Sequence, residues 1–213
     1  ATRYLKELKE EIPEVAEWIP LEEYKNFGEH FQKLVKDRKL TGEIDPTKRR
    51  FISPKREAYL RISDGCNNFC TFCAIPYIRG HFKSVPFETL KTELNEMEED
   101  GIRSLTVISQ DTSRYGKDIG LTLTDLVKEI VKHPTFDFVK LRYLYPDEVP
   151  QELIDLYAAD NSLTPYFDLP VQHFSNNVLK HRGRRGTEQD IIDLIHRFRE
   201  KVPNSIIRTT VMV

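Results

Sequence analysis

Five apolar, extended stretches alternate with helical patterns along most of the chain, and this alternation constrains the fold most. Between the stretches, apolar residues recur at helical spacing, as they do from Leu123 to Val131,. The five stretches cover residues 58–62, 102–109, 138–145, 166–171 and 206–213. Strands that alternate with helices in this way form a parallel sheet with crossover helices. The sequence therefore predicts an α/β fold over residues 49–213, namely a partial (β/α) TIM-like barrel.

The first 48 residues have a different character. Two charged, helix-like stretches, 3–12 and 22–39, precede a polar segment from Thr41 to Lys55 that we expect to be a linker,. We expect residues 1–48 to be the end of a separate α/β domain plus this linker. The chain begins without Met and stops within 206–213, which we expect to be a buried strand, so truncation at both ends is also expected,.

The composition excludes several classes of protein. The formal net charge is −2, so the chain has no overall excess of positive charge. Charge alone therefore does not support nucleic-acid binding. No apolar run approaches the roughly 20 residues of a membrane span, and no segment resembles a signal peptide. No glycine-rich dinucleotide or phosphate-binding loop is present. We therefore expect a cytoplasmic protein that has no membrane partner.

The chain has three cysteines, spaced as Cys66-x3-Cys70-x2-Cys73. An odd number packed so closely cannot form a disulfide framework, which indicates a reducing compartment and metal ligation. The motif directly follows the predicted strand 58–62, and the loops after the strands carry the chemistry of α/β barrels,. Three thiolates can hold three corners of a 4Fe-4S cluster and leave the fourth iron open to a small molecule.

Two other interpretations of the cysteines stay open. The first is a set of buried structural thiols, although core cysteines would not be expected to gather within one short segment. The second is a zinc site completed by His81, although the spacing differs from the paired C-x2-C knuckles that are typical of zinc,. If a cluster binds, we expect Phe69 and Phe72, which lie between the cysteines, to shield it from water.

The cysteine motif, with the aromatic Phe72 before the last cysteine, resembles that of the radical S-adenosylmethionine (SAM) enzymes. The resemblance implies that the amino and carboxylate groups of SAM bind the open iron, with Phe72 among the cofactor contacts. It also implies that the reduced cluster cleaves SAM into methionine and a 5′-deoxyadenosyl radical. In such enzymes the cofactor performs the difficult chemical steps, and the protein binds and orients the cofactor. A flavodoxin or ferredoxin is the expected electron donor.

The segment 73–80, which reads CAIPYIRG, resembles the signature of the methylthiotransferases, which insert sulfur into a C–H bond and methylate it. Three further segments, 108–116, 141–146 and 170–173, resemble the RimO branch of that family. That branch modifies the β-carbon of an aspartate in a small-subunit ribosomal protein. The resemblance implies this protein as the substrate, a contact with the ribosome surface and a monomeric enzyme. The alternatives are the transfer-RNA (MiaB-like) branch and a zinc-stabilised ribosome- or RNA-binding module.

Polar residues that follow the predicted strands complete the candidate site. Gln110 and Asp111 follow the second strand, and the resemblance implies that they contact SAM, with strand-end capping as the alternative. Arg142 and Tyr143 lie on the third strand and His173 follows the fourth. We expect these three residues to contact the substrate. Alternation along a strand makes one of Arg142 and Tyr143 structural, and a hydrogen-bonded loop histidine is the alternative for His173.

Three further expectations concern charge and cofactors. Arg208 lies in an apolar strand and, if buried, needs an anionic partner,. This partner is either the SAM carboxylate, which makes Arg208 a cofactor contact, or an internal acid. The basic run 181–186 is expected to be a solvated face, with a ribosome or RNA contact as the alternative,. Family members carry three more cysteines for a second cluster, which we expect only in the full-length enzyme.

Overall fold

The computed structural model describes residues 4–35 and 56–212. Strands and helices alternate through the second of these ranges. The main elements are β1 (Glu57–Arg61), α4 (Phe87–Glu99), β4 (Ser104–Ile108), α5 (Leu123–Ile130), β5 (Phe138–Leu141), α6 (Gln151–Ala159), β6 (Tyr166–Asp168), α8 (Glu188–Lys201) and β7 (Ile206–Arg208). The predicted α/β alternation is thus confirmed. Most of the strands are shorter than predicted, because the residues at their carboxyl ends turn into the loops of the site.

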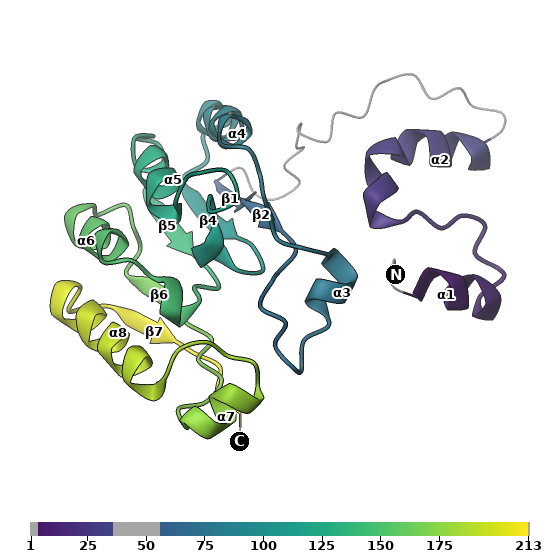
Figure 1. The fold of residues 1–213 in the computed structure, drawn as a ribbon. Coiled ribbons are helices and arrows are strands. Elements are labelled where there is room, and N and C mark those ends of the chain that lie inside the picture. Colours follow the sequence, from purple (N-terminus) through teal and green to yellow (C-terminus); the bar gives the residue numbers. More distant parts are fainter. Residues whose placement is uncertain (1–3, 36–55, 213) are drawn as a thin grey trace.

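The strands follow one another in chain order across an open, parallel sheet. β1, β4 and β5 form one three-stranded sheet, and β6 pairs with β7. A parallel bridge between Val139 and Leu163 links β5 to the residues just before β6. Figure 1 shows α4, α5, α6 and α8 along one side of these strands. The fold is therefore a partial (β/α) barrel, as predicted, and the described residues do not close it.

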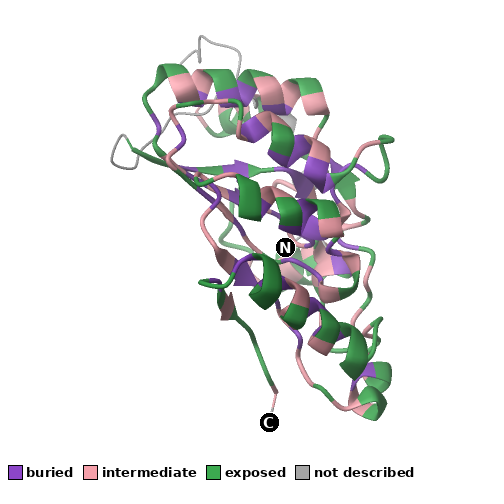
Figure 2. Ribbon diagram, turned by 90° about the vertical axis from the view of Figure 1, so that its left-hand side faces the viewer, coloured by how far each residue is buried: buried purple, intermediate pink, exposed green. Residues whose placement is uncertain are grey.

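The hydrophobic core lies between the strands and the helices. Alternate strand residues such as Leu60, Val107 and Leu141 are fully buried there, because side chains alternate between the two faces of a strand,. Figure 2 shows buried residues concentrated on the strands and on the adjoining faces of the helices. The other face of the sheet is open, so Tyr59 and Phe138 are 61% and 58% exposed.

A capping box starts helix α8. The Thr187 hydroxyl accepts a hydrogen bond from the Asp190 amide, and the Asp190 carboxylate accepts one from the Thr187 amide. A threonine followed three positions later by an acidic residue is a sequence pattern typical of such a cap,. We expect Thr187→Ala to lower the free energy of unfolding by about 1 kcal/mol, because the Asp190 amide in the first turn loses its hydroxyl acceptor,. Urea unfolding measures this change. Thr187→Ser is the control and should retain the stability, and an equal loss in both variants would contradict the assignment.

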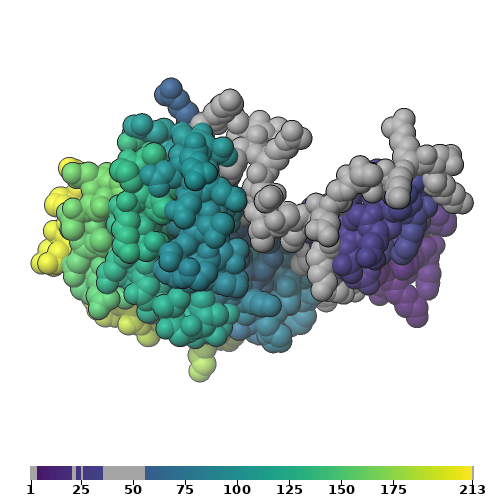
Figure 3. Space-filling view, turned by 90° about the horizontal axis from the view of Figure 1, so that it is seen from above, coloured from purple at the N-terminus to yellow at the C-terminus, as the bar shows by residue number. Residues whose placement is uncertain are grey.

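The first described range holds α1 (Leu5–Glu11), a 3₁₀ turn (Leu21–Asn26) and α2 (Phe27–Leu34). Figure 3 shows these helices, in purple, beside the larger body of the chain. The predicted linker and the domain boundary after residue 48 fall outside the described residues, so the division into two domains stays a prediction. None of the helices in the two described ranges combines the length and apolarity that a membrane span requires.

The end of the chain differs from its prediction. The run 206–213 was expected to form a buried strand, but β7 ends at Arg208 and residues 208–211 are exposed. The expectation is wrong because β7 pairs with β6 alone, and within the described ranges no further strand covers its other edge. Sequence patterns also miss three short features: α3 (Ile75–Arg79), α7 (Asn176–His181) and the β2–β3 pair (Ser63–Asp64 with Lys83–Ser84).

Candidate metal centre

The three cysteines lie on one closed loop after β1, at the carboxyl ends of the parallel strands. Pairing of β2 with β3 brings the two ends of residues 65–82 together. Cys66 is buried, Cys70 and Cys73 are half-buried, and all three are free thiols. The loop position predicted from the sequence is confirmed, and we call residues 65–82 the cysteine lobe.

Gly65, at the start of this lobe, packs directly against the backbone of Gly80 and His81. Gly65 has a φ of +72°, and a β-carbon there would lie 2.1 Å from the carbonyl oxygen of His81. The Cys66 amide donates to the Gly80 carbonyl at 3.2 Å. The Phe82 amide donates to the Asn67 side-chain oxygen at 3.0 Å. Only glycine satisfies both the positive φ and the close approach at position 65.

We expect Gly65→Ala to displace the cysteine lobe and to remove most of its capacity to bind iron after reconstitution. The matched control is Gly120→Ala, because Gly120 has a similar φ of +75° but nothing within 4 Å of its β-carbon position. The control should lose about 1–2 kcal/mol of stability from the left-handed backbone alone and keep its iron. Iron analysis and urea unfolding measure both effects. Equal iron in the two variants would contradict the packing argument.

A second segment, Arg182–Arg184, lies against the other end of the lobe, and we call it the clasp. The Thr71 amide donates to the Arg182 carbonyl at 3.2 Å. A β-carbon on Gly183 would lie 3.4 Å from the Phe69 carbonyl oxygen. The Arg182 guanidinium lies 5.6 Å from the centre of the Phe72 ring. The expected solvated face is confirmed for His181, Gly183, Arg185 and Gly186, which are exposed. Arg182 and Arg184 are half-buried because of these contacts.

Asn68 joins the lobe to the residues after β4, and sequence reasoning missed it. Its amide donates to an Asp111 carboxylate oxygen at 2.7 Å. Asp111 is 1% exposed. Burial raises the pKa of Asp111 to about 6, and the hydrogen bond from Asn68 opposes the rise,. The only sequence signal for Asn68 was its place between two of the cysteines.

The residues present fit a cluster and a polar cofactor. Three thiols on one loop supply three ligands, and burial raises the pKa of Cys66, so metal binding would have to release its proton,. Within the described ranges, the Gln110 amide oxygen and one Asp111 carboxylate oxygen are buried without a hydrogen-bond partner. Such acceptors suit a ligand that carries N–H or O–H donors.

The described residues contain no preformed zinc site of the kind that the zinc alternative requires. Among the described residues, no three His, Cys, Asp or Glu side chains are gathered closely enough to hold a metal ion. This applies to the three cysteines as well, so their thiols would have to draw together around a cluster. The Nδ1 atom of His81 instead lies 3.1 Å from the Asn67 side-chain oxygen.

Asp168 forms ion pairs with two of the predicted site residues, Arg142 and Arg208. Its carboxylate is buried, with Arg142 Nε at 3.1 Å and Arg208 Nη1 at 2.8 Å. The Arg208 side chain is 47% exposed, so the condition of burial is not met, although Arg208 does have an anionic partner. Its anionic partner is an internal acid, one of the two alternatives, and the hydrogen bond to Asp168 raises the pKa of Arg208. Two guanidinium groups against one carboxylate leave a net positive charge at this rim.

The remaining predicted residues lie on neighbouring rim loops. Tyr143 is 42% exposed. His173 Nδ1 accepts a hydrogen bond from the Ser175 amide at 2.8 Å. This contact is the one expected for the alternative, a hydrogen-bonded loop histidine. The three non-glycine residues with positive φ in the described ranges are Phe69, Tyr143 and Gln172. All three lie on these loops, and strained backbone of this kind clusters at functional sites.

Phe69 and Phe72, which lie between the cysteines, are partly exposed in the structure. Each of the two side chains is 46% exposed. The Phe69 ring packs edge-on against Tyr77 and His81, with ring centres 6.0 and 6.2 Å apart. These contacts, together with the Arg182 contact of Phe72, hold both rings at the surface of the lobe, and the shielding of a bound cluster stays a prediction.

Comparisons with known proteins identify the class. The family model for the Radical SAM superfamily matches residues 60–213, and the chain belongs to this superfamily. Membership implies a 4Fe-4S cluster and SAM as cofactors.

Among curated proteins, the chain is 36% identical to the "Ribosomal protein uS12 methylthiotransferase RimO" of Clostridioides difficile, over 100% of the chain and 50% of the relative. It is 37% identical to the RimO of Clostridium acetobutylicum, over 99% and 49%. These relatives confirm the resemblance to the RimO branch. The chain spans about half the length of the curated relatives it matches.

Two solved structures share the fold. The cobalamin-dependent SAM radical enzyme OxsB superposes with a TM-score of 0.64 at 14% identity, covering 99% of this chain and 35% of that one. The radical SAM methyltransferase TsrM from Kitasatospora setae superposes with a TM-score of 0.57 at 19% identity, covering 77% and 33%. At these identities the likeness concerns the fold alone.

Proposed function

We propose that the chain carries the radical SAM part of a methylthiotransferase that adds a methylthio group to the β-carbon of an aspartate in ribosomal protein uS12. One observation carries the proposal: the cysteine lobe is tied through Asn68 to Asp111, beside buried acceptors that have no partner in the described ranges. The names of the relatives, which match the chain over almost its whole length, support the same activity.

Different residues of the chain are proposed to bind the cluster and SAM. Cys66, Cys70 and Cys73 hold the cluster, which when bound supplies the electron that cleaves SAM. Gln110 and Asp111 accept hydrogen bonds from donor groups of SAM, because their buried oxygens have no described partner. Phe72 and Arg208 are proposed as further SAM contacts, and the net positive charge around Asp168 supports an interaction with the carboxylate of SAM.

Arg142, Tyr143 and His173 are proposed to contact the protein substrate. Arg142 lies 3.1 Å from Asp168 and shares that carboxylate with Arg208, so its charge is only partly neutralised. The aspartate to be modified carries a carboxylate, and guanidinium groups bind carboxylates well. Tyr143 is exposed beside it, with its ring centre 5.7 Å from the Arg142 guanidinium.

The partners follow from this activity. A cytoplasmic, monomeric enzyme that contacts the ribosome surface is proposed, because its substrate is a ribosomal protein. A flavodoxin or ferredoxin is proposed as the electron donor. A second cluster, held by residues outside this chain, is proposed to take part in sulfur delivery.

The test is mass spectrometry of uS12 and of transfer RNA after anaerobic incubation with SAM and a reductant. The enzyme is the Clostridioides difficile relative in which this chain replaces the matching segment, with the same chimera carrying Cys66→Ala as the control. We expect a methylthio mass gain on an aspartate of uS12 that the control lacks. A gain on transfer RNA alone would overturn the choice of substrate. No gain from a chimera that still cleaves SAM would overturn the proposed reaction.

A further inference from the structure

Arg184 is fixed beside a cysteine that lies far away in the sequence. Its Nη1 lies 3.9 Å from the Sγ atom of Cys70, across 114 residues of chain. Its Nη2 donates to the Pro170 carbonyl oxygen. Its guanidinium lies 4.4 Å from the centre of the Tyr145 ring. Three contacts from three different loops therefore hold this cation in one place.

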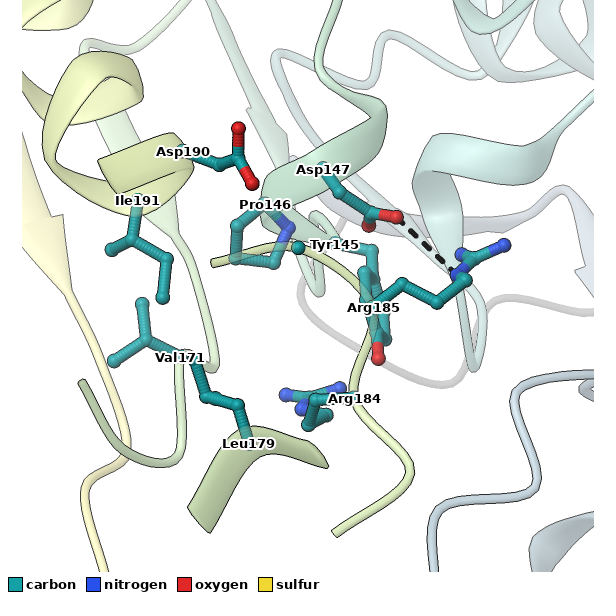
Figure 4. A pocket seen from close by; sticks show the side chains of 10 residues that line it. Tyr145, Pro146, Asp147, Val171, Leu179, Arg184, Arg185, Asp190 and Ile191 are labelled. Atoms are coloured by element: carbon teal, nitrogen blue, oxygen red, sulfur yellow. Dashed lines mark ion pairs between the residues drawn. The ribbon is translucent and has the colours of Figure 1, made fainter. Parts of the chain in front are cut away.

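Arg184 and Arg185 have different electrostatic surroundings. Arg185 forms ion pairs with Asp147 at 3.3 Å and with Glu148 at 2.8 Å, so two carboxylates compensate its charge. Figure 4 shows both arginines beside Tyr145, with the dashed ion pair joining Arg185 to Asp147. In the described part of the chain, no carboxylate forms an ion pair with Arg184. Its positive charge is thus available to the thiolate of Cys70.

We propose that Arg184 acts through Cys70 to raise the reduction potential of the cluster that the three cysteines hold. The inference rests on the cluster of the proposed function, but not on the identity of the substrate. Reduction adds one electron from a low-potential one-electron donor to the cluster, and no bond forms or breaks at Arg184. The added negative charge is stabilised by a nearby cation and by hydrogen bonds to the cluster sulfurs.

The clasp explains why the cation stays in position. The Thr71 amide bonds to the Arg182 carbonyl, and Gly183 approaches the Phe69 backbone, so the residues on both sides of Cys70 contact the segment that carries Arg184. Arg182 supplies a matched comparison. It also carries a guanidinium on the clasp, but its contact is with the Phe72 ring and not with sulfur.

The test compares Arg184→Met and Arg184→Lys with Arg182→Met, using the reconstituted 213-residue chain. Iron content is measured first. The midpoint potential then comes from a dithionite titration followed by electron paramagnetic resonance of the reduced cluster. We expect Arg184→Met to load iron like the wild type and to be reduced about tenfold less favourably, which is about 59 mV for a one-electron couple. Arg184→Lys should shift less, because it keeps the charge but loses the planar fork, and Arg182→Met should stay near the wild type.

Two results from the loaded variants would overturn the proposal. A fully loaded Arg184→Met with the wild-type potential would overturn it. Equal shifts in Arg184→Met and Arg182→Met would also overturn it, because overall charge would then be the cause. If Arg184→Met fails to load, Arg184→Lys decides: a lowered potential supports the proposal and an unchanged one overturns it. If neither variant loads, the role of Arg184 is structural. A wild-type chain that binds no cluster would instead contradict the proposed function.

Discussion

Cys66→Ser is expected to abolish iron binding and SAM cleavage together. Loss of one of three ligands leaves only two thiolates for a cluster that normally takes four. Iron should fall from about four per chain to background, and 5′-deoxyadenosine should become undetectable. Iron analysis and chromatography of the reaction products measure the two losses.

Thr71→Ser is the control for this change. Thr71 lies on the same loop, and its exposed side chain contributes no thiol. The control should keep both iron and activity, since the Thr71 contact with the clasp runs through its backbone amide. Full iron in Cys66→Ser, or an equal loss in Thr71→Ser, would show that the cysteines do not hold the cluster in the proposed way.

Phe167→Ala is expected to have the largest effect on stability. Phe167 is fully buried in β6, and its ring centre lies 3.8 Å from that of Phe198 and 4.7 Å from that of Tyr157. Truncation of a buried phenylalanine costs about 3–5 kcal/mol, which is a large fraction of a typical stability of roughly 5–15 kcal/mol. Because Asp168 directly follows Phe167 in the chain, its ion pairs with Arg142 and Arg208 should also weaken. Urea unfolding measures the loss.

Phe138→Ala is the control for the core substitution. Phe138 is also a strand phenylalanine, but it is 58% exposed on the open face of the sheet. Its removal should change the free energy of unfolding by less than about 0.5 kcal/mol, as for surface positions in general. Similar losses in the two variants would contradict the assignment of the core to the helix-covered face.

The fold could be predicted from the sequence because its signals are local. Apolar periodicity in 123–131 and the cap at Thr187 each depend on residues within one or two turns. The parallel arrangement follows because consecutive parallel strands need a crossover, and helical patterns fill each interval. The cysteine motif is equally local, so its place after the first strand could be predicted as well.

The rest of the site depends on contacts between distant segments. The clasp meets the cysteine lobe across more than a hundred residues, as the separation of 114 between Cys70 and Arg184 shows. The run 181–186 alone resembles any solvated basic segment. Asn68 and Asp168 likewise acquire their roles from partners on other loops. The exposure of Arg208 depends on what covers β7, and this is a property of the assembled sheet rather than of an apolar run.

The most direct test of the account is the cleavage of SAM by the anaerobically reconstituted chain after reduction with dithionite. The account predicts a brown protein with about four irons per chain that releases 5′-deoxyadenosine and methionine. A protein that binds about one zinc ion and no iron, or one that holds the full cluster and releases no 5′-deoxyadenosine, would contradict it.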